Sequence, residues 1–476
     1  MKAKLPERRG RSVASVNNKL MVLILLGALG LAFTTALRIS EKDEPVYVPA
    51  SPQRSGDAAA GYRYLTTGDY IKSGLPYNFF LLGFGKRPDS LLRRDGLNAN
   101  IPYSYTAVKA ANGVEVVAPN CLQCHAQVFD GKLYIGLGNA SIDFSDPRKF
   151  GAGASGRVEQ LLEHDTSNYA AAAAPFLTSL KAIGGGIRTE VRGVNSADRL
   201  TGLLVAHRDP QTLRWSNQPR MTISGKVVPT DTPPWWLLKK KHAMFYNGFG
   251  RGDFGRFLMA SNLLTVSDSS EAREVDGHFN DVLAYIYSIQ PPVYPYPIDR
   301  ALAKRGGVLF VQYCSKCHGN YGEGGDYPNL LIPESTIGTD SLLNTNDYQS
   351  PQIVDWFNGS WFAAGDHPAR LEPFNGYIAP PLDGIWITAP YLHNGSVPTL
   401  EGVLNSKARP RYWSRDFDHP RYDYTAVGWK YKKEDGPGGA AVYNTTLPGY
   451  GNRGHNFGDR LTDRKRKAII EYLKTL

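Results

Sequence analysis

All four cysteines of the chain occur in two copies of the pattern C-x-x-C-H. The motif residues are Cys121, Cys124, His125, Cys314, Cys317 and His318. Two thiols three positions apart can bond to both vinyl groups of a haem, and the imidazole that follows can bind the haem iron. The spacing therefore predicts two covalently attached haem c groups, with His125 and His318 as the proximal iron ligands.

Other uses of a C-x-x-C pair fit this sequence less well. A thioredoxin-like redox pair needs no following histidine and belongs in a βαβ context, which the sequence lacks. A zinc site of four thiolates commonly has its two pairs roughly 15–20 residues apart, whereas these pairs lie at 121–124 and 314–317. The two haem motifs also leave no cysteine over for a disulfide.

The iron of the second haem can take a further ligand, and no methionine follows His318 to provide one. A methionine ligand raises the reduction potential of a haem, so its absence predicts a comparatively low potential. Histidine, lysine, tyrosine or no residue could fill the position. The C-terminal histidines are His367, His393, His419 and His455. The first and third of these precede proline and are interpreted as turn residues.

Amphipathic segments lie on both sides of the second motif, and another lies at the end of the region that contains the first motif. Residues 301–310 form a predicted helix that leads to the second motif, and residues 463–476 place their apolar side chains near one helical face. Residues 278–289 are an earlier counterpart, and the Pro-rich run at 291–295 marks a boundary. We expect a mainly α fold with two cytochrome c-type haem domains, at 55–292 and 298–476, joined by long irregular loops.

The N-terminus predicts export from the cytoplasm. Residues 20–37 carry no charge and are just long enough as a helix to cross a bilayer. Residues 1–19 form a basic region before this segment, and the acidic run 41–44 follows it, which keeps the N-terminus inside. The segment is either a retained inner-membrane anchor or a cleaved signal peptide. Both interpretations put the haem domains in the periplasm.

The net charge of +10 does not indicate a nucleic-acid partner, because residues 1–38 hold seven basic side chains against one acidic one. The remainder shows no basic stripe with interleaved aromatic residues. With 42% hydrophobic and 21% charged residues, the 476-residue chain is also not disordered as a whole.

The two motifs, together with the stretch T-A-P-Y-x-H-x-G-S-x-P-T-L at 388–400, resemble the bacterial di-haem cytochrome c peroxidase superfamily. The likeness covers roughly residues 60–476. The segments 136–139, 234–241 and 454–458 look closer to its rubber-oxygenase-like branch. The chain departs from the peroxidases in having no histidine between His125 and His164, so their distal acid–base residue is not evident.

This resemblance implies roles for several residues. His455, in a G-H-x-x-G segment, matches the sixth ligand of the second haem in that branch, and His393 would support a haem edge. A surface histidine in a Gly-rich loop is the alternative for His455. The aromatic stretch 235–257 would form an apolar distal pocket over an open first haem. The pocket residues expected there are Trp236, Phe249 and Phe254.

Other ligands for the first iron stay open at this point. His242 or Met244 could bind it and close the site. The lysines at 239–241 are interpreted as a solvated run, with a haem propionate as the alternative partner. Family members often hold a Ca²⁺ between domains, which the resemblance implies here without assigning ligands.

The function expected on this basis is a periplasmic di-haem oxidoreductase. Its first haem would reduce peroxide, or activate O₂ for a small organic substrate, while the second relays electrons. The alternative is a non-catalytic electron carrier in a membrane-associated redox chain. Either would exchange electrons with a redox partner protein or a quinol-linked donor.

Overall fold

The computed structural model describes residues 44–476, except 147–159, 161, 163–167, 224–225 and 347–349. The predicted basic region at 1–19 and the predicted membrane segment at 20–37 lie outside the described residues. Residues 46–476 form one compact unit. Its fold is mixed and mostly helical, with small sheets of short strands, so the expected mainly helical chain is confirmed only in this coarser form.

Two long helices cross in the region of the first motif. They are α2 (Ala58–Thr67) and α10 (Ser269–Ser288), and each begins after an aspartate whose carboxylate accepts two backbone N–H groups of the first turn. The two backbones touch, because a Cβ added at Gly61 would lie 1.9 Å from the carbonyl oxygen of Asp281. The lack of a side chain at Gly61 is therefore what allows this crossing.

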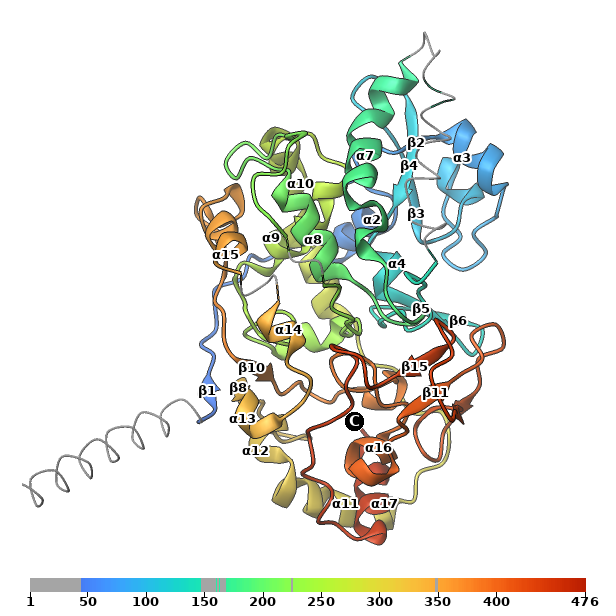
Figure 1. Ribbon diagram of the computed structural model, residues 1–476, viewed down its shortest axis with the longest axis vertical. Helices are drawn as coiled ribbons and strands as arrows, with labels where there is room; N and C mark the ends of the chain where they lie inside the picture. Colours follow the sequence, from blue (N-terminus) through green and yellow to red (C-terminus); the bar gives the residue numbers. More distant parts are fainter. Residues whose placement is uncertain (1–43, 147–159, 161, 163–167, 224–225, 347–349) are drawn as a thin grey trace, which may run out of the picture. The chain divides into compact units, whose positions relative to one another are not determined.

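The second motif lies beside a crossing of the same kind. Helix α11 (Arg300–Tyr313) begins after Asp299, whose carboxylate accepts the N–H of Leu302, and packs along α17 (Asp463–Leu473) (Figure 1). A Cβ added at Gly306 would lie 1.9 Å from the carbonyl oxygen of Ala468. The predicted helices at 301–310 and 463–476 are thus present, and each haem motif is accompanied by its own pair of crossing helices.

Further helices complete the helical part of the fold. The remaining α-helices of the described residues are α3 (Tyr77–Phe84), α4 (Leu122–His125), α7 (Tyr169–Ile183), α8 (Ala197–Ala206), α9 (Phe254–Leu258), α12 (Ser315–His318), α13 (Glu334–Ile337), α14 (Leu342–Thr345), α15 (Pro351–Asn358) and α16 (Leu400–Leu404). Helix α7 with the 3₁₀ turn after it, Tyr169–Ile187, is the one described helix with the length and apolarity of a membrane span. Core helices share those properties, and 39% of this span is buried.

The strands pair in small antiparallel sheets. The sheet orders are β1-β8-β10, β14-β11-β15, β2-β4-β3, β12-β13, β5-β6 and β7-β9. The strands are β1 (Val46–Tyr47), β2 (Leu75–Pro76), β3 (Tyr105–Lys109), β4 (Glu115–Pro119), β5 (Ala126–Phe129), β6 (Lys132–Ile135), β7 (Gly250–Gly252), β8 (Leu330–Pro333), β9 (Ala369–Leu371), β10 (Gly376–Ile378), β11 (Tyr412–Ser414), β12 (Tyr422–Asp423), β13 (Gly428–Trp429), β14 (Lys432–Lys433) and β15 (Val442–Asn444).

Each of the two largest hydrophobic cores contains side chains from both halves of the chain. One core surrounds α10 and also includes apolar side chains from 353–371, which follow the second motif. The other surrounds α17 and includes Phe129, Leu137 and Trp236 from the first half of the chain. The boundary predicted at 292–298 falls between α10 and α11, but packing joins the two halves on both sides of it.

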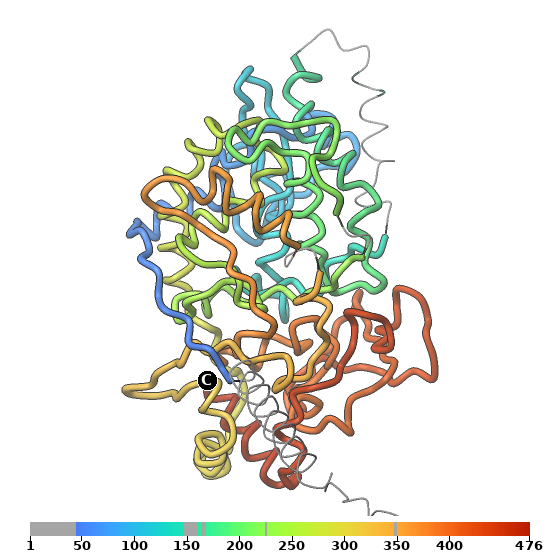
Figure 2. Tube along the Cα trace, turned by 60° about the vertical axis from the view of Figure 1, so that its left-hand side comes forward, coloured from blue at the N-terminus to red at the C-terminus, as the bar shows by residue number. Residues whose placement is uncertain are grey.

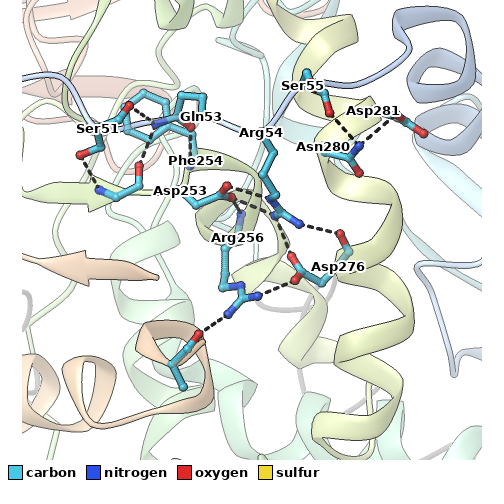
Figure 3. Close-up of polar contacts among 12 residues, drawn as sticks. Ser51, Gln53, Arg54, Ser55, Asp253, Phe254, Arg256, Asp276, Asn280 and Asp281 are labelled. Carbon is cyan, nitrogen blue, oxygen red and sulfur yellow. Dashed lines mark hydrogen bonds and ion pairs between the residues drawn. The ribbon is translucent and has the colours of Figure 1, made fainter. Parts of the chain in front are cut away.

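The segment before α2 adds a polar connection between distant parts of the chain. It begins at β1, which pairs with β8, and runs as the blue tube of Figure 2 to α2. Along it, Arg54 donates hydrogen bonds to the carboxylates of Asp253 and Asp276, and Arg256 donates to the same Asp276 (Figure 3). These charged groups are largely buried, so they are paired rather than solvated.

Candidate haem sites

Each C-x-x-C-H motif forms a single helical turn. In the first, Asn120 accepts the N–H of Leu122 through its side-chain oxygen, and the N–H of His125 donates to the carbonyl of Cys121. In the second, the N–H groups of Cys317 and His318 both donate to the carbonyl of Cys314. A helical turn brings residues three apart onto one face, so each pair of thiols lies on one side of its turn.

None of the four thiols forms a disulfide. Burial raises the pKa of Cys121 to about 11 and that of Cys124 to about 12. It also raises the pKa of Cys314 to about 11. Thiolates are the form that binds zinc, so this environment does not favour a thiolate metal site.

One continuous cavity of about 780 Å³ connects the two motifs. Its volume lies within the range of roughly 300–1,000 Å³ that ligand pockets occupy, and its lining is mostly apolar. All four cysteines line it, together with His125, His318, His393 and His455. At each motif, two thiols and one imidazole therefore face a ligand-sized space, which is the set of groups that a haem c requires.

His318 is held in the tautomer that binds a metal. Its Nδ1 lies 2.8 Å from the carbonyl oxygen of Pro380. A carbonyl only accepts hydrogen bonds, so Nδ1 carries the proton and Nε2 keeps a free lone pair. Burial lowers the pKa of His318, which favours the neutral imidazole.

 

His455 lies near His318, although 137 positions separate the two along the chain. The centroids of the two imidazole rings lie 6.2 Å apart. Two metal–nitrogen bonds of about 2 Å, plus about 1.1 Å from each nitrogen to its ring centre, add up to roughly that separation. The pair therefore fits an iron held between two imidazoles.

The loop that carries His455 has an unusual backbone. His455 has a φ of 46°, in the left-handed region that few residues other than glycine adopt. Its N–H donates to the carbonyl of Ile337, and the Arg409 guanidinium donates to the carbonyls of Asn452, Gly454 and His455. Arg409 thus fixes the loop conformation that presents the histidine. Burial, with smaller effects of His318 and Arg409, lowers the pKa of His455 to about 4.

The surroundings of His125 differ from those of His318. Its ring stacks on Trp235, with centroids 4.5 Å apart and planes 17° apart, and its Nδ1 has no hydrogen-bond partner. Burial lowers its pKa to about 3, so the imidazole is neutral. No second imidazole of the described residues makes a ring contact with His125.

The distal-pocket role expected of three aromatic residues stays a prediction. Trp236, Phe249 and Phe254 are buried, but they are not among the residues that line the cavity. Trp236 instead donates its indole N–H to the carbonyl of Asp383. Apolar residues that do line the cavity include Leu204 and Phe257.

The alternative ligands predicted for the first iron also differ in whether they line the cavity. His242 does not line the cavity, and its Nδ1 lies 2.8 Å from the carbonyl oxygen of Val48. Met244 and Lys241 do line it. Lys239 and Lys240 lie against Gln290 and Asp383, so the three consecutive lysines are not one solvated run.

His393 lies at the cavity and packs against Tyr377, with ring centroids 4.4 Å apart. Burial lowers its pKa to about 4. Its role at a haem edge stays a prediction, as does a bound Ca²⁺. Within the described ranges, no group of three or more His, Cys, Asp or Glu side chains is placed to hold a metal ion.

Several polar residues of the cavity were not predicted. Asp231 accepts a hydrogen bond from the Tyr246 hydroxyl, and burial raises its pKa to about 8. Asn247 is buried beside the cavity with no hydrogen-bond partner for either amide atom. Neither residue belongs to a motif, so only the folded chain identifies them.

Comparison with known proteins indicates a cytochrome c domain in the second half of the chain. A family described as "RoxA-like, cytochrome c-like" matches residues 376–414, which contain the T-A-P-Y-x-H stretch. This match indicates a haem c protein with a redox role.

Two similar proteins come from Sinorhizobium fredii (strain NBRC 101917 / NGR234), and both are described as uncharacterized. Protein y4iM is 27% identical over 288 residues, which cover 52% of this chain and 64% of y4iM. Protein y4iJ is 38% identical over 255 residues, which cover 40% of this chain and 41% of y4iJ. The matched regions therefore span less than two thirds of either relative.

Proposed function

We propose that the protein is an exported c-type cytochrome with two covalent haems that acts as a peroxidase- or oxygenase-like oxidoreductase. The observation that carries the proposal is the single cavity lined by both complete C-x-x-C-H motifs. The repeated helix crossing supports it, because each motif has its own glycine-mediated pair, at Gly61 and at Gly306.

The second haem would be the electron relay. His318 and His455 would hold its iron from both sides, as the 6.2 Å ring separation supports. Two imidazoles and no methionine favour a low potential. With both positions filled by the protein, this iron would exchange electrons rather than bind a substrate.

The first haem would be the site of chemistry. His125 would be its proximal ligand, and the stack on Trp235 would fix the orientation of the imidazole. Bound haem supplies the redox-active iron, while the chain supplies the ligand, the apolar enclosure and the exclusion of water. Peroxide, or O₂ with a small organic substrate, is the class of reactant that such a site would take.

A non-catalytic electron carrier is the second candidate. The observation that favours it is that Met244 and Lys241 line the cavity and could provide a sixth ligand for the first iron. Under either function we propose a periplasmic location, attachment or export through the N-terminal segment, and electron exchange with a redox partner protein or a quinol-linked donor.

Mass spectrometry and spectroscopy of the protein purified from an export-competent host test the presence of two haems and the choice between the two functions. Its intact mass should include two haems, and the pyridine haemochrome spectrum should show the c-type band. Electron paramagnetic resonance should show one low-spin and one high-spin ferric haem, with the high-spin signal changing when peroxide is added. Two low-spin haems that ignore peroxide would support the electron carrier, and a mass without two haems would overturn the proposal.

A further inference from the structure

Two polar side chains with unmet bonding capacity lie at the cavity. Asn247 is 1% exposed and neither its amide nitrogen nor its oxygen has a partner. Lys241 is 8% exposed, and its ammonium donates one hydrogen bond, to the carbonyl of Phe245 at 3.1 Å. No carboxylate in the described part of the chain lies within ion-pair distance of this ammonium. Both residues line the cavity.

Such groups rarely stay unpaired in a protein interior. A buried ammonium without a carboxylate is disfavoured, and an unpartnered buried amide calls for a ligand or water that completes it. Asn344 is an instructive comparison, because both of its amide atoms are also unpartnered and it is fully buried, but it does not line the cavity. Asn247 differs from Asn344 because it lines the cavity and belongs to the same segment as Lys241.

The segment 241–247 lies between the two haem motifs. Tyr246 accepts the N–H of Ile378 at its carbonyl, and the strand β10 that ends at Ile378 leads to Pro380, the partner of His318. Met244 belongs to the core around α10, on the side of the first motif. A ligand held by this segment would therefore be within the region that both haems share.

An ammonium and an amide N–H are both donors, and together they suit a carboxylate. Each haem carries two propionate carboxylates, which need such partners when they are buried. We propose that Lys241 and Asn247 bind a propionate of one of the two haems. This inference rests on the proposed function, because it requires the haems to be present.

The test compares reduction potentials in the intact holoprotein. A positive charge near a haem favours the added electron, so Lys241→Met should lower the equilibrium constant for reduction of one haem about tenfold, or ~59 mV for one electron. Lys241→Arg keeps the charge and should stay within about threefold of the unaltered protein. Asn247→Leu should shift the same haem by a smaller factor, and Asn344→Leu is the matched control that should shift neither.

The haem whose potential moves identifies the source of the propionate. Intact mass is measured on every variant, so a protein that lacks its haems counts against the proposed function and not against this assignment. If Lys241→Met fails to fold, Asn247→Asp replaces it, and this variant should lower the potential of the same haem through charge repulsion. Two retained haems with both potentials unchanged in the folded variants would overturn the inference.

Discussion

The imidazole rings of His318 and His455 lie close together, with 6.2 Å between their centroids. His318 is oriented by the carbonyl of Pro380, and His455 is presented by a loop with a left-handed backbone. Local backbone strain of this kind is tolerated when surrounding contacts fix it, and it often occurs at functional sites. The two residues therefore suit the ligand positions of the proposed second haem.

Under the proposed function, His455→Ala should convert one low-spin haem to high-spin, because it would remove one of two imidazole ligands while the proposed thioether bonds remain. Electron paramagnetic resonance and optical spectra of the ferric protein measure the change, and added imidazole should restore the low-spin signal. His419→Ala is the control, since that side chain is 89% exposed. An unchanged low-spin signal in His455→Ala would show that another residue binds the iron.

Arg409→Met should disturb His455 indirectly, through the loop that carries it. It removes hydrogen bonds from a charged donor to the carbonyls around His455, and we expect it to lower the free energy of unfolding by roughly 2–3 kcal/mol. The low-spin signal should also become partly high-spin. Denaturant unfolding and the ferric spectrum measure the two effects. Arg411→Met, on an exposed side chain, should change stability by less than about 0.5 kcal/mol.

The helix crossings predict a pair of matching effects. Gly61→Ala and Gly306→Ala would each place a methyl group against a backbone carbonyl of the partner helix. We expect each to lower the free energy of unfolding by about 1–3 kcal/mol. Gly277→Ala, in α10 with nothing within 4 Å of the added Cβ, should instead raise it by roughly 0.5–1 kcal/mol. Equal effects at all three glycines would contradict the close approach.

The sequence was sufficient for the parts of the site that depend on local spacing. The C-x-x-C-H motifs and the helices beside the second one follow from short-range patterns. The directions in which neighbouring side chains point do not follow from such patterns. Trp235 and Trp236 are adjacent in the 3₁₀ helix Trp235–Lys240, yet the first stacks on His125 and the second bonds to Asp383.

The polar side of the cavity depends on contacts between distant segments. Arg409 meets a loop more than forty residues away, and the Asn247 segment is placed by β10. No period or motif encodes such contacts, because their partners become neighbours only after folding. The aromatic density at 235–257 likewise reflected core packing as well as the cavity, so it could not identify which rings reach the cavity.

The polar cluster of Figure 3 predicts a large effect of Arg54→Met. This change leaves the largely buried carboxylates of Asp253 and Asp276 without one cation. Breaking a buried ion pair on one side typically costs about 3–5 kcal/mol, and the remaining Arg256 should keep the loss near the lower value. Lys72→Met, whose partners Asp69 and Glu274 are exposed, should cost less than about 1 kcal/mol. Denaturant unfolding distinguishes the two, and equal losses would contradict the assigned burial.

The raised pKa of Asp231 predicts how the free energy of unfolding depends on pH. Burial raises its pKa from 3.8 to about 8, so the folded protein keeps a proton that the unfolded chain releases between these values. The folded state binds more protons in that window, and its stability therefore falls as pH rises, by up to about 1.4 kcal/mol per pH unit from this group. Asp231→Asn should remove this part of the slope, whereas Asp366→Asn, in an exposed loop, should leave it unchanged. Unfolding free energies measured from pH 5 to pH 8 give the slopes, and an identical slope in Asp231→Asn would mean that the carboxyl is already ionised in the folded protein.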